Sequence, residues 1–225
     1  YQRIKHTWSA GKCIYCGASQ SEYERGTELE TYAYQFIHNL DVKKLFNMKF
    51  DVIIGNPPYQ LSDGGGTGSS AMPIYHKFIQ QAKKLNPRYL TMIVPSRWFT
   101  GGKGLDEFRD EMLHDEHIRE IHDFGNANAC FPGVAIEGGV CYFLWNRESK
   151  GLCKVYSHSQ NQVTAMSERP LLEKGADVFI RYNEVISIIR KVASFNEKSF
   201  STLVSPRNPY YFRTSFTDSK NTINT

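Results

Sequence analysis

A short apolar run followed at once by two prolines constrains the fold of this chain more than any other feature. Residues 50–55 read Phe-Asp-Val-Ile-Ile-Gly, and a β-branched run that ends on glycine is typical of a buried parallel strand. Asn56, Pro57, Pro58 and Tyr59 follow directly, and proline interrupts both strand pairing and helices. The chain must therefore leave the sheet here, and ligands of open α/β sheets bind outside the carboxyl ends of the strands.

Strand-like and helix-like segments alternate along the rest of the chain. Runs of Val, Ile, Tyr and Phe indicate strands, and apolar residues at helical spacing indicate helices. This alternation predicts an α/β fold with a doubly wound, mostly parallel sheet. The expected strands are residues 89–95, 118–124, 139–145 and 153–156, and the expected helices are residues 72–85, 105–113 and 183–192.

The composition is that of an ordinary water-soluble protein. Of 225 residues, 40% are hydrophobic and 22% are charged, and no apolar run approaches the ~18 residues that a membrane span needs. The net charge of +4 permits a nucleic-acid partner without requiring one. Five scattered cysteines indicate free thiols in a reducing cytoplasm. The chain begins with Tyr1 instead of methionine, so we expect it to be a piece of a longer protein.

The polar segment at residues 1–30 carries Cys13 and Cys16 at CxxC spacing, followed by glycine. This arrangement is typical of one knuckle of a zinc ribbon. A structural zinc site needs four ligands, and the nearest further donors in the sequence are His6 and His38. A partial zinc knuckle therefore stands beside two alternatives, an unmetallated turn and a site completed by other sequence, and no metal is assigned.

Two interpretations fit the segment Asn56-Pro57-Pro58-Tyr59. Asn and Pro are turn formers, so it can be a simple turn after a strand. It also suits chemistry on an aromatic amine, because the Asn56 side-chain oxygen and the Pro57 carbonyl can each accept one amino hydrogen. Holding both hydrogens aims the nitrogen lone pair at a methyl donor, and the prolines fix the acceptors in place. Tyr59 adds a stacking face worth roughly 1–3 kcal/mol to a base.

These residues resemble the amino-methyltransferases of DNA, in which an (Asp/Asn)-Pro-Pro-(Tyr/Phe) signature follows the fourth strand. The resemblance covers residues 28–192 and implies a Rossmann-like methyltransferase fold that uses S-adenosylmethionine. Because the target amino group is hidden in duplex DNA, the resemblance also implies that the base is flipped into the site. The residues that it makes catalytic are Asn56, Pro57, Pro58 and Tyr59.

Further residues take roles by the same resemblance. Asp41 falls where the family binds the adenine amino group of the cofactor, and Phe131 and Pro132 fall where relatives place an aromatic ring against that adenine. Tyr182 falls where the family supplies a second aromatic wall for the flipped base; packing at a helix start is the alternative.

Three residues after the strand at 89–95 are candidates for contact with DNA. Arg97 and Trp98 could touch the DNA backbone or the displaced partner base, and a surface cap on the strand is the alternative. Lys103, in a Gly-Gly-Lys-Gly turn, could touch a phosphate.

The order of the motifs resembles the γ class of adenine-specific enzymes, and the phrases FDVIIGNPPYQ, PSRWF and GGVCYFLW resemble methylases of type II restriction–modification systems. The resemblance implies methylation of the exocyclic amino group of adenine in DNA by a bacterial, cytoplasmic and nucleoid-associated enzyme. Its expected partners are double-stranded DNA with a flipped adenine and a restriction endonuclease domain or subunit, with no membrane partner.

The family's first motif, a glycine-rich loop after strand one, does not precede Asp41. Residues 64–70 are glycine-rich but follow the motif and lack the Gly-Lys-Ser/Thr of a phosphate loop. We therefore expect residues 31–195 to be the carboxyl-terminal part of a catalytic domain that binds the cofactor weakly or not at all. Residues 196–225 would be a linker or the start of a target-recognition region.

Three other functions share some of these features. A protein-glutamine methyltransferase can hold a planar amide with the same motif, although the long extension beyond Tyr59 favours DNA. A non-catalytic DNA-binding or specificity fragment would explain the missing first motif. Enzymes that methylate the amino group of cytosine share the signature, more often with serine or aspartate at its first position. Asparagine at this position, as in Asn56, favours adenine.

Overall fold

The computed structural model describes residues 7–15, 20, 36–38, 41–46, 48–60, 72–159, 162–198 and 200–204. The chain forms two compact units, Tyr1–Ile186 and Ser187–Thr225. The second unit contains most of α5 (Ile186–Ala193) and η5 (Phe200–Leu203). None of the described helices is long and apolar enough to cross a membrane.

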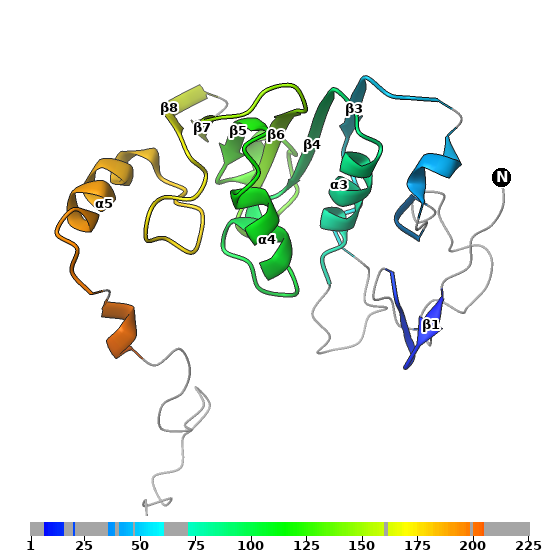
Figure 1. Cartoon of the computed structure of the whole chain (residues 1–225), viewed down its shortest axis with the longest axis horizontal. Helices are drawn as coiled ribbons and strands as arrows, with labels where there is room; N and C mark the ends of the chain where they lie inside the picture. Colours follow the sequence, from blue (N-terminus) through cyan, green and yellow to red (C-terminus); the bar gives the residue numbers. More distant parts are fainter. Residues whose placement is uncertain are drawn as a thin grey trace, which may run out of the picture. The chain divides into compact units, whose positions relative to one another are not determined.

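In the described part of the chain, six strands form the main sheet in the order β3-β4-β6-β5-β7-β8 (Figure 1). Parallel pairing joins β3 to β4 and β5 to β7, whereas β6 is antiparallel to both of its neighbours and β8 is antiparallel to β7. Each strand expected from the sequence is confirmed, and β8 is additional. The strands are β3 (Val52–Gly55), β4 (Tyr89–Pro95), β5 (Ile118–Phe124), β6 (Val140–Asn146), β7 (Cys153–Ser159) and β8 (Gln162–Arg169).

The sheet is mixed, which corrects the expectation of a mostly parallel one. The connection from β5 to β6 holds only the short helix η3 (Ala127–Ala129), and a chain without a crossover helix returns antiparallel. Gly139 makes this return possible, because its φ is +79° and a Cβ there would lie 2.1 Å from the carbonyl oxygen of Phe124. Strand β6 thereby enters the sheet between β4 and β5.

The two described helices that connect strands lie on one face of the sheet (Figure 1). Helix α3 (Tyr75–Lys84) joins β3 to β4, and α4 (Asp106–Leu113) joins β4 to β5. Right-handed crossovers that advance in one direction across a sheet place their helices on the same face. The expected helices are confirmed, but the expected double winding is corrected, since the described part of the sheet is wound on one face only. The third expected helix is η4 (Asn183–Val185) followed by α5.

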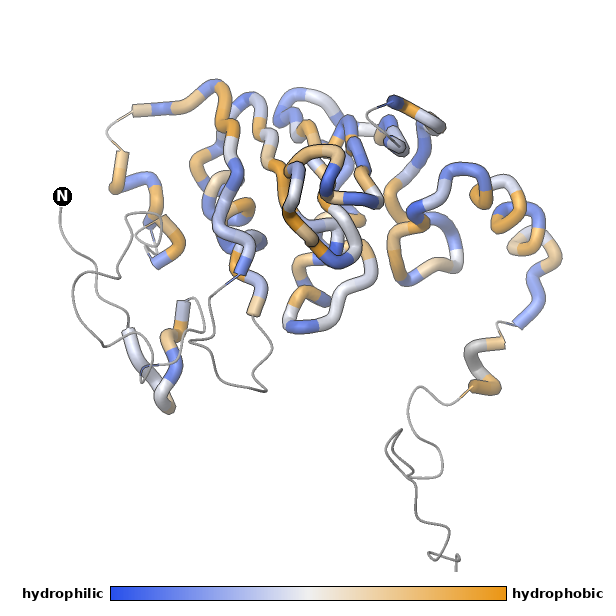
Figure 2. The backbone as a smooth tube through the Cα atoms, turned by 180° about the vertical axis from the view of Figure 1, so that it is seen from behind, coloured by the Kyte–Doolittle hydropathy of each residue, from blue (hydrophilic) through white to orange (hydrophobic). Residues whose placement is uncertain are grey.

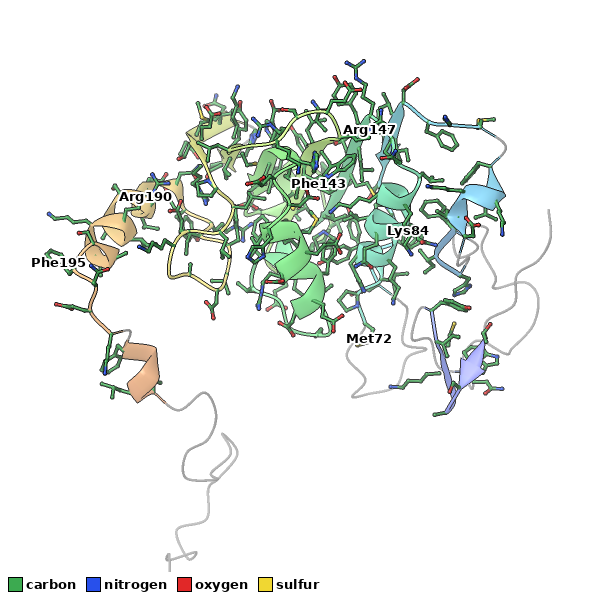
Figure 3. The ribbon with its side chains drawn as sticks, viewed as in Figure 1. Met72, Lys84, Phe143, Arg147, Arg190 and Phe195 are labelled. Atoms are coloured by element: carbon green, nitrogen blue, oxygen red, sulfur yellow. The ribbon has the colours of Figure 1, made fainter. Side chains whose placement is uncertain are left out.

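The main core lies between this face and the two helices. Buried and half-buried residues alternate along most of β4, and Figure 2 shows hydrophobic and hydrophilic residues interspersed along the chain. Leu90 and Phe143 are fully buried, whereas Lys84 at the end of α3 is exposed (Figure 3). The opposite face is open at β3, where Ile54 is 78% and Val52 is 50% exposed. This corrects the expectation that the first strand is buried on both faces, because Ile53 packs against the main core while Val52 and Ile54 point to the other side of the strand.

A smaller core holds the amino-terminal residues. Strands β1 (Trp8–Ser9) and β2 (Lys12–Cys13) form a hairpin, and η1 (Val42–Leu45) follows later in the chain. Cys13 and Ile37 are buried against Ile74 and Phe78 at the start of α3. The glycine-rich run at residues 64–70 lies outside the described residues.

Candidate active site

The carboxyl ends of three strands place the candidate site. Asn56 to Tyr59 follow the end of β3, Pro95 ends β4 and Arg97 follows it, and Phe131 lies on the connection that follows β5. These three strands point in the same direction, as the pairings through β6 require. The site therefore lies where α/β sheets bind ligands, as the sequence predicts.

One cavity of about 630 Å³ collects these residues. Its volume falls within the roughly 300–1,000 Å³ of ligand pockets. Asn56 lines the cavity and is exposed, whereas the neighbouring Pro57 is buried. The buried proline restrains the backbone that carries Asn56, and the Asn56 amide can contact a ligand. The candidate residues that line the cavity are Asn56, Pro58, Tyr59, Arg97, Lys103 and Phe131.

Tyr59 and Phe131 form the aromatic part of the cavity. Their ring centroids lie 6.4 Å apart with an interplanar angle of 67°. Burial, together with nearby Cys141 and Cys130, raises the pKa of Tyr59 to about 12, so its ring stays neutral over the physiological range. The carbonyl oxygen of Tyr59 accepts a hydrogen bond from the backbone N–H of Ile74 (3.1 Å), which fixes the motif to the start of α3.

Trp98 is fully buried, which corrects the expectation that it contacts DNA. The short helix η2 (Ser96–Phe99) turns its ring inward against Phe99, Phe108 and Phe179, with ring centroids 4.7, 6.1 and 6.4 Å away. Arg97, by contrast, lines the cavity.

Three other candidate residues lie outside the lining of this cavity. Asp41 directly precedes η1, and its half-exposed carboxylate pairs with Lys44 (3.2 Å). Pro132 is exposed beside Phe131, and Tyr182 is 67% exposed before η4. Of the two cysteines in the CxxC pair, Cys13 is buried and Cys16 lies outside the described residues.

A buried ion pair lies beside the cavity, and the sequence patterns did not predict it. Asp123 at the end of β5 is 4% exposed and accepts hydrogen bonds from Nε and Nη2 of Arg181 (2.5 and 2.7 Å) and from Oγ of Ser96 (3.0 Å). Burial alone would lower the pKa of Arg181, but the hydrogen bond and charge of Asp123 raise it above its ordinary value. The signal was the position of Asp123, two residues after buried Ile121 on the same strand face.

A second cavity of about 320 Å³ adjoins the first, and Arg97 and Glu137 line both. Arg181 lines the second cavity together with Phe99 and Phe179. The site thus continues from the Asn56 motif toward a wall that carries two guanidinium groups.

Fold and site together define a class, the α/β proteins that carry an Asn-Pro-Pro-Tyr motif beside a cavity at the carboxyl end of a strand. Residues 1–131 match the family described as Eco57I restriction-modification methylase, and the chain belongs to this family. An uncharacterized adenine-specific methylase of Mycoplasma pneumoniae is 42% identical to it over 149 residues, which are 62% of this chain and 35% of that protein.

Solved structures add distant similarities. The type I restriction-modification methyltransferase subunit of Streptococcus thermophilus is 14% identical, with 68% of this chain and 33% of that chain covered and a TM-score of 0.34. A modification subunit of a putative type I restriction enzyme from Vibrio vulnificus is 10% identical, with 67% and 32% covered and a TM-score of 0.37. The chain spans about a third of the length of these relatives.

Proposed function

We propose that this chain forms the target-base side of the active site in an S-adenosylmethionine-dependent methyltransferase that acts on the exocyclic amino group of adenine in DNA. One observation carries the proposal: Asn56, Tyr59 and Phe131 share one cavity at the carboxyl ends of parallel strands. Membership of the restriction-modification methylase family supports it, as does the relative named an adenine-specific methylase.

Asn56 and Pro57 would act on the amine. An aromatic amine is a weak nucleophile because its lone pair is delocalised into the ring. The Asn56 Oδ1 and the Pro57 carbonyl oxygen can accept its two hydrogens, which draws the nitrogen toward tetrahedral geometry and localises the lone pair. Acceptors that are fixed before the reaction lower the barrier, because they need no reorganisation when charge develops.

Tyr59 and Phe131 would hold the flipped base. A base stacked on the neutral face of Tyr59 would meet the ring of Phe131 with its edge, given the 67° between the two rings. Phe131 would thereby serve as the second aromatic wall, the role that the resemblance gives to Tyr182, in place of the contact with the cofactor's adenine that the resemblance gives to Phe131. Arg97 and Lys103 line the same cavity and would contact the phosphates that flank the flipped nucleotide.

S-adenosylmethionine would supply a methyl group already activated on its sulfonium. The described residues do not make a complete site for it, because Asp41 pairs with Lys44 outside the cavity lining and no glycine-rich loop precedes Asp41 in the sequence. The contribution of this chain is to hold and orient the amine and to exclude water from it. We also propose a restriction endonuclease domain or subunit as a partner of the full-length protein.

Methyl transfer by the full-length protein that contains this segment tests the proposal. With radiolabelled S-adenosylmethionine and unmethylated DNA, we expect Asn56→Ala to reduce label in DNA by about 100-fold or more, as removal of a fixed electrostatic contact does. Asn56→Asp keeps an acceptor and should retain measurable transfer.

A matched pair of aromatic variants tests the base-binding walls. Phe131→Ala should lower kcat/KM by roughly 2- to 13-fold, the equivalent of one lost edge-to-face aromatic contact of about 0.5–1.5 kcal/mol, whereas Tyr182→Ala should lower it less than Phe131→Ala does. A larger loss of kcat/KM in Tyr182→Ala than in Phe131→Ala would instead make Tyr182 the second aromatic wall for the base. Label in protein glutamine instead of DNA would overturn the proposed substrate.

A further inference from the structure

Methyl transfer in the first cavity leaves the second cavity, of about 320 Å³, without a role. The two cavities adjoin each other, because Arg97 and Glu137 line both. The other polar residues that line the second cavity are Ser96, Thr100 and Arg181. A space beside the base cavity that carries two guanidinium groups is suited to an anion.

Arg181 is held in one orientation before any ligand arrives. Its Nε and Nη2 donate hydrogen bonds to the carboxylate of Asp123 (2.5 and 2.7 Å), and its guanidinium carbon lies 5.8 Å from the ring centroid of Phe99. The backbone N–H of Phe179 donates to the carbonyl oxygen of Phe99 (3.1 Å), which fixes the segment that carries Arg181. A guanidinium held in this way loses little conformational freedom when it binds a ligand.

Both guanidinium groups keep donors for a ligand. A guanidinium has five N–H donors, and the two on Nη1 of Arg181 have no hydrogen-bond partner in the part of the chain that the structure describes. The Nε atom of Arg97 is buried and also lacks a hydrogen-bond partner among the described residues. A buried donor without a partner costs free energy, so a ligand oxygen that accepts from Arg97 Nε would remove this cost.

The acidic residues near the second cavity do not cancel its attraction for an anion. Asp123 is bonded to Arg181 and is not part of the cavity lining. Glu137 lines the cavity but is exposed, so solvent and salt screen its charge. Arg97 and Arg181 are only partly exposed, and their charges are therefore screened less.

We propose that Arg97 and Arg181 bind, in the second cavity, a phosphate of the DNA backbone beside the flipped nucleotide. This inference rests on the proposed function, which places the base in the first cavity. A flipped base stays attached to its sugar and phosphates, so the wall next to the base cavity meets the DNA backbone. Guanidinium groups suit this ligand because two neighbouring N–H groups can bind two phosphate oxygens. Asp123 is then a positioning residue that orients Arg181.

The salt dependence of DNA binding tests this role in the full-length protein that contains this segment. The probe is a fluorescein-labelled duplex with one adenine opposite an abasic site, where flipping costs less. Its affinity would be measured by fluorescence anisotropy at about 50–200 mM KCl. We expect Arg181→Gln to weaken binding by roughly 10-fold or more. The slope of log K against log[salt] should become shallower by about 0.9, the equivalent of one phosphate contact.

Two control variants separate this contact from effects on the fold. Asp123→Asn breaks the same ion pair as Arg181→Gln but leaves the cation in place, so it should destabilise the protein and keep the wild-type salt slope. Arg88→Gln should also keep that slope, because Arg88 pairs with Glu148 (2.9 Å) before the amino end of β4, opposite the end that the cavities occupy. A wild-type slope in Arg181→Gln would overturn the subsite and leave Arg181 a structural role alone.

A change in the probe keeps the test independent of whether the variants fold. Methylphosphonate in place of one phosphate next to the adenine removes a single charge from the DNA. At one of the flanking linkages it should make the wild-type slope shallower by about 0.9, and it should add little further loss in Arg181→Gln, because both changes remove the same contact. Wild-type protein that binds the duplex but is insensitive to methylphosphonate at every flanking linkage would overturn the subsite alone. Wild-type protein that does not bind the duplex would overturn the proposed function with it.

Discussion

The ion pair between Asp123 and Arg181 offers the sharpest stability prediction. Asp123 is 4% exposed, and its carboxylate accepts two hydrogen bonds from Arg181 and one from Ser96. The pair joins the end of β5 to residues 179–181, whose Phe179 packs on Phe99 with ring centroids 4.3 Å apart. Asp123→Asn removes the charge and leaves the guanidinium without its counter-ion.

The expected cost follows from the burial of both partners. Removing one partner of a buried pair costs about 3–5 kcal/mol. The side chain of Arg181 is 24% exposed, so solvent screens part of its charge and we expect the lower end, about 3 kcal/mol. For a chain of this length, each kcal/mol shifts Tm by roughly 2–4 °C, so Tm should fall by roughly 6–12 °C.

Thermal unfolding followed by circular dichroism measures this shift. Asp110→Asn is the matched control, because Asp110 makes an exposed i,i+4 pair with His114 (3.3 Å), and such pairs contribute about 0–1 kcal/mol. A fall in Tm for Asp123→Asn no larger than that for Asp110→Asn would refute the claim that the buried pair stabilises the fold more than an exposed pair does.

Three further predictions concern the backbone, pH and the cofactor. Gly139→Ala should prevent the close return of β6 and abolish cooperative unfolding, whereas Gly138→Ala, with positive φ but nothing within 4 Å of its Cβ, should cost only about 1 kcal/mol. Burial, aided by Lys77, lowers the pKa of His76 from 6.5 to about 4; the unfolded chain therefore binds the proton first, and the free energy of unfolding should fall between pH 6.5 and 4 by up to about 3 kcal/mol. His76→Gln should flatten this part of the pH profile measured by urea titration. Isothermal titration calorimetry of this chain with S-adenosylmethionine should show weak or no binding, and tight stoichiometric binding would contradict the incomplete cofactor site.

Local patterns predicted the elements of the fold and the place of the candidate cavity. The runs rich in β-branched and aromatic residues at β3, β4, β5 and β6 are strands as expected, because such residues suit a pleated, half-buried surface. The two prolines after Gly55 force the chain out of the sheet. Asn56 and Tyr59 therefore reach a cavity at the carboxyl end of β3, which follows from chain connectivity alone.

Long-range contacts account for what the sequence did not predict. The mixed sheet depends on one close approach of Gly139 to Phe124, and no pattern in the sequence predicts this contact. Trp98 follows a strand end and suggested a surface position, yet a turn of η2 buries it beneath α4. Residues 131 and 182 are both aromatic and follow the motif, and only the fold separates the one that lines the cavity from the one that does not.

Identification of the methylated nucleoside tests the central claim most directly. Full-length protein that contains this segment would be incubated with unmethylated DNA and S-adenosylmethionine, and the digested nucleosides would be separated by liquid chromatography and mass spectrometry. We predict N6-methyladenine in the wild-type reaction and its loss in Asn56→Ala. N4-methylcytosine as the product, or no methylated nucleoside while the cofactor is bound, would contradict the claim.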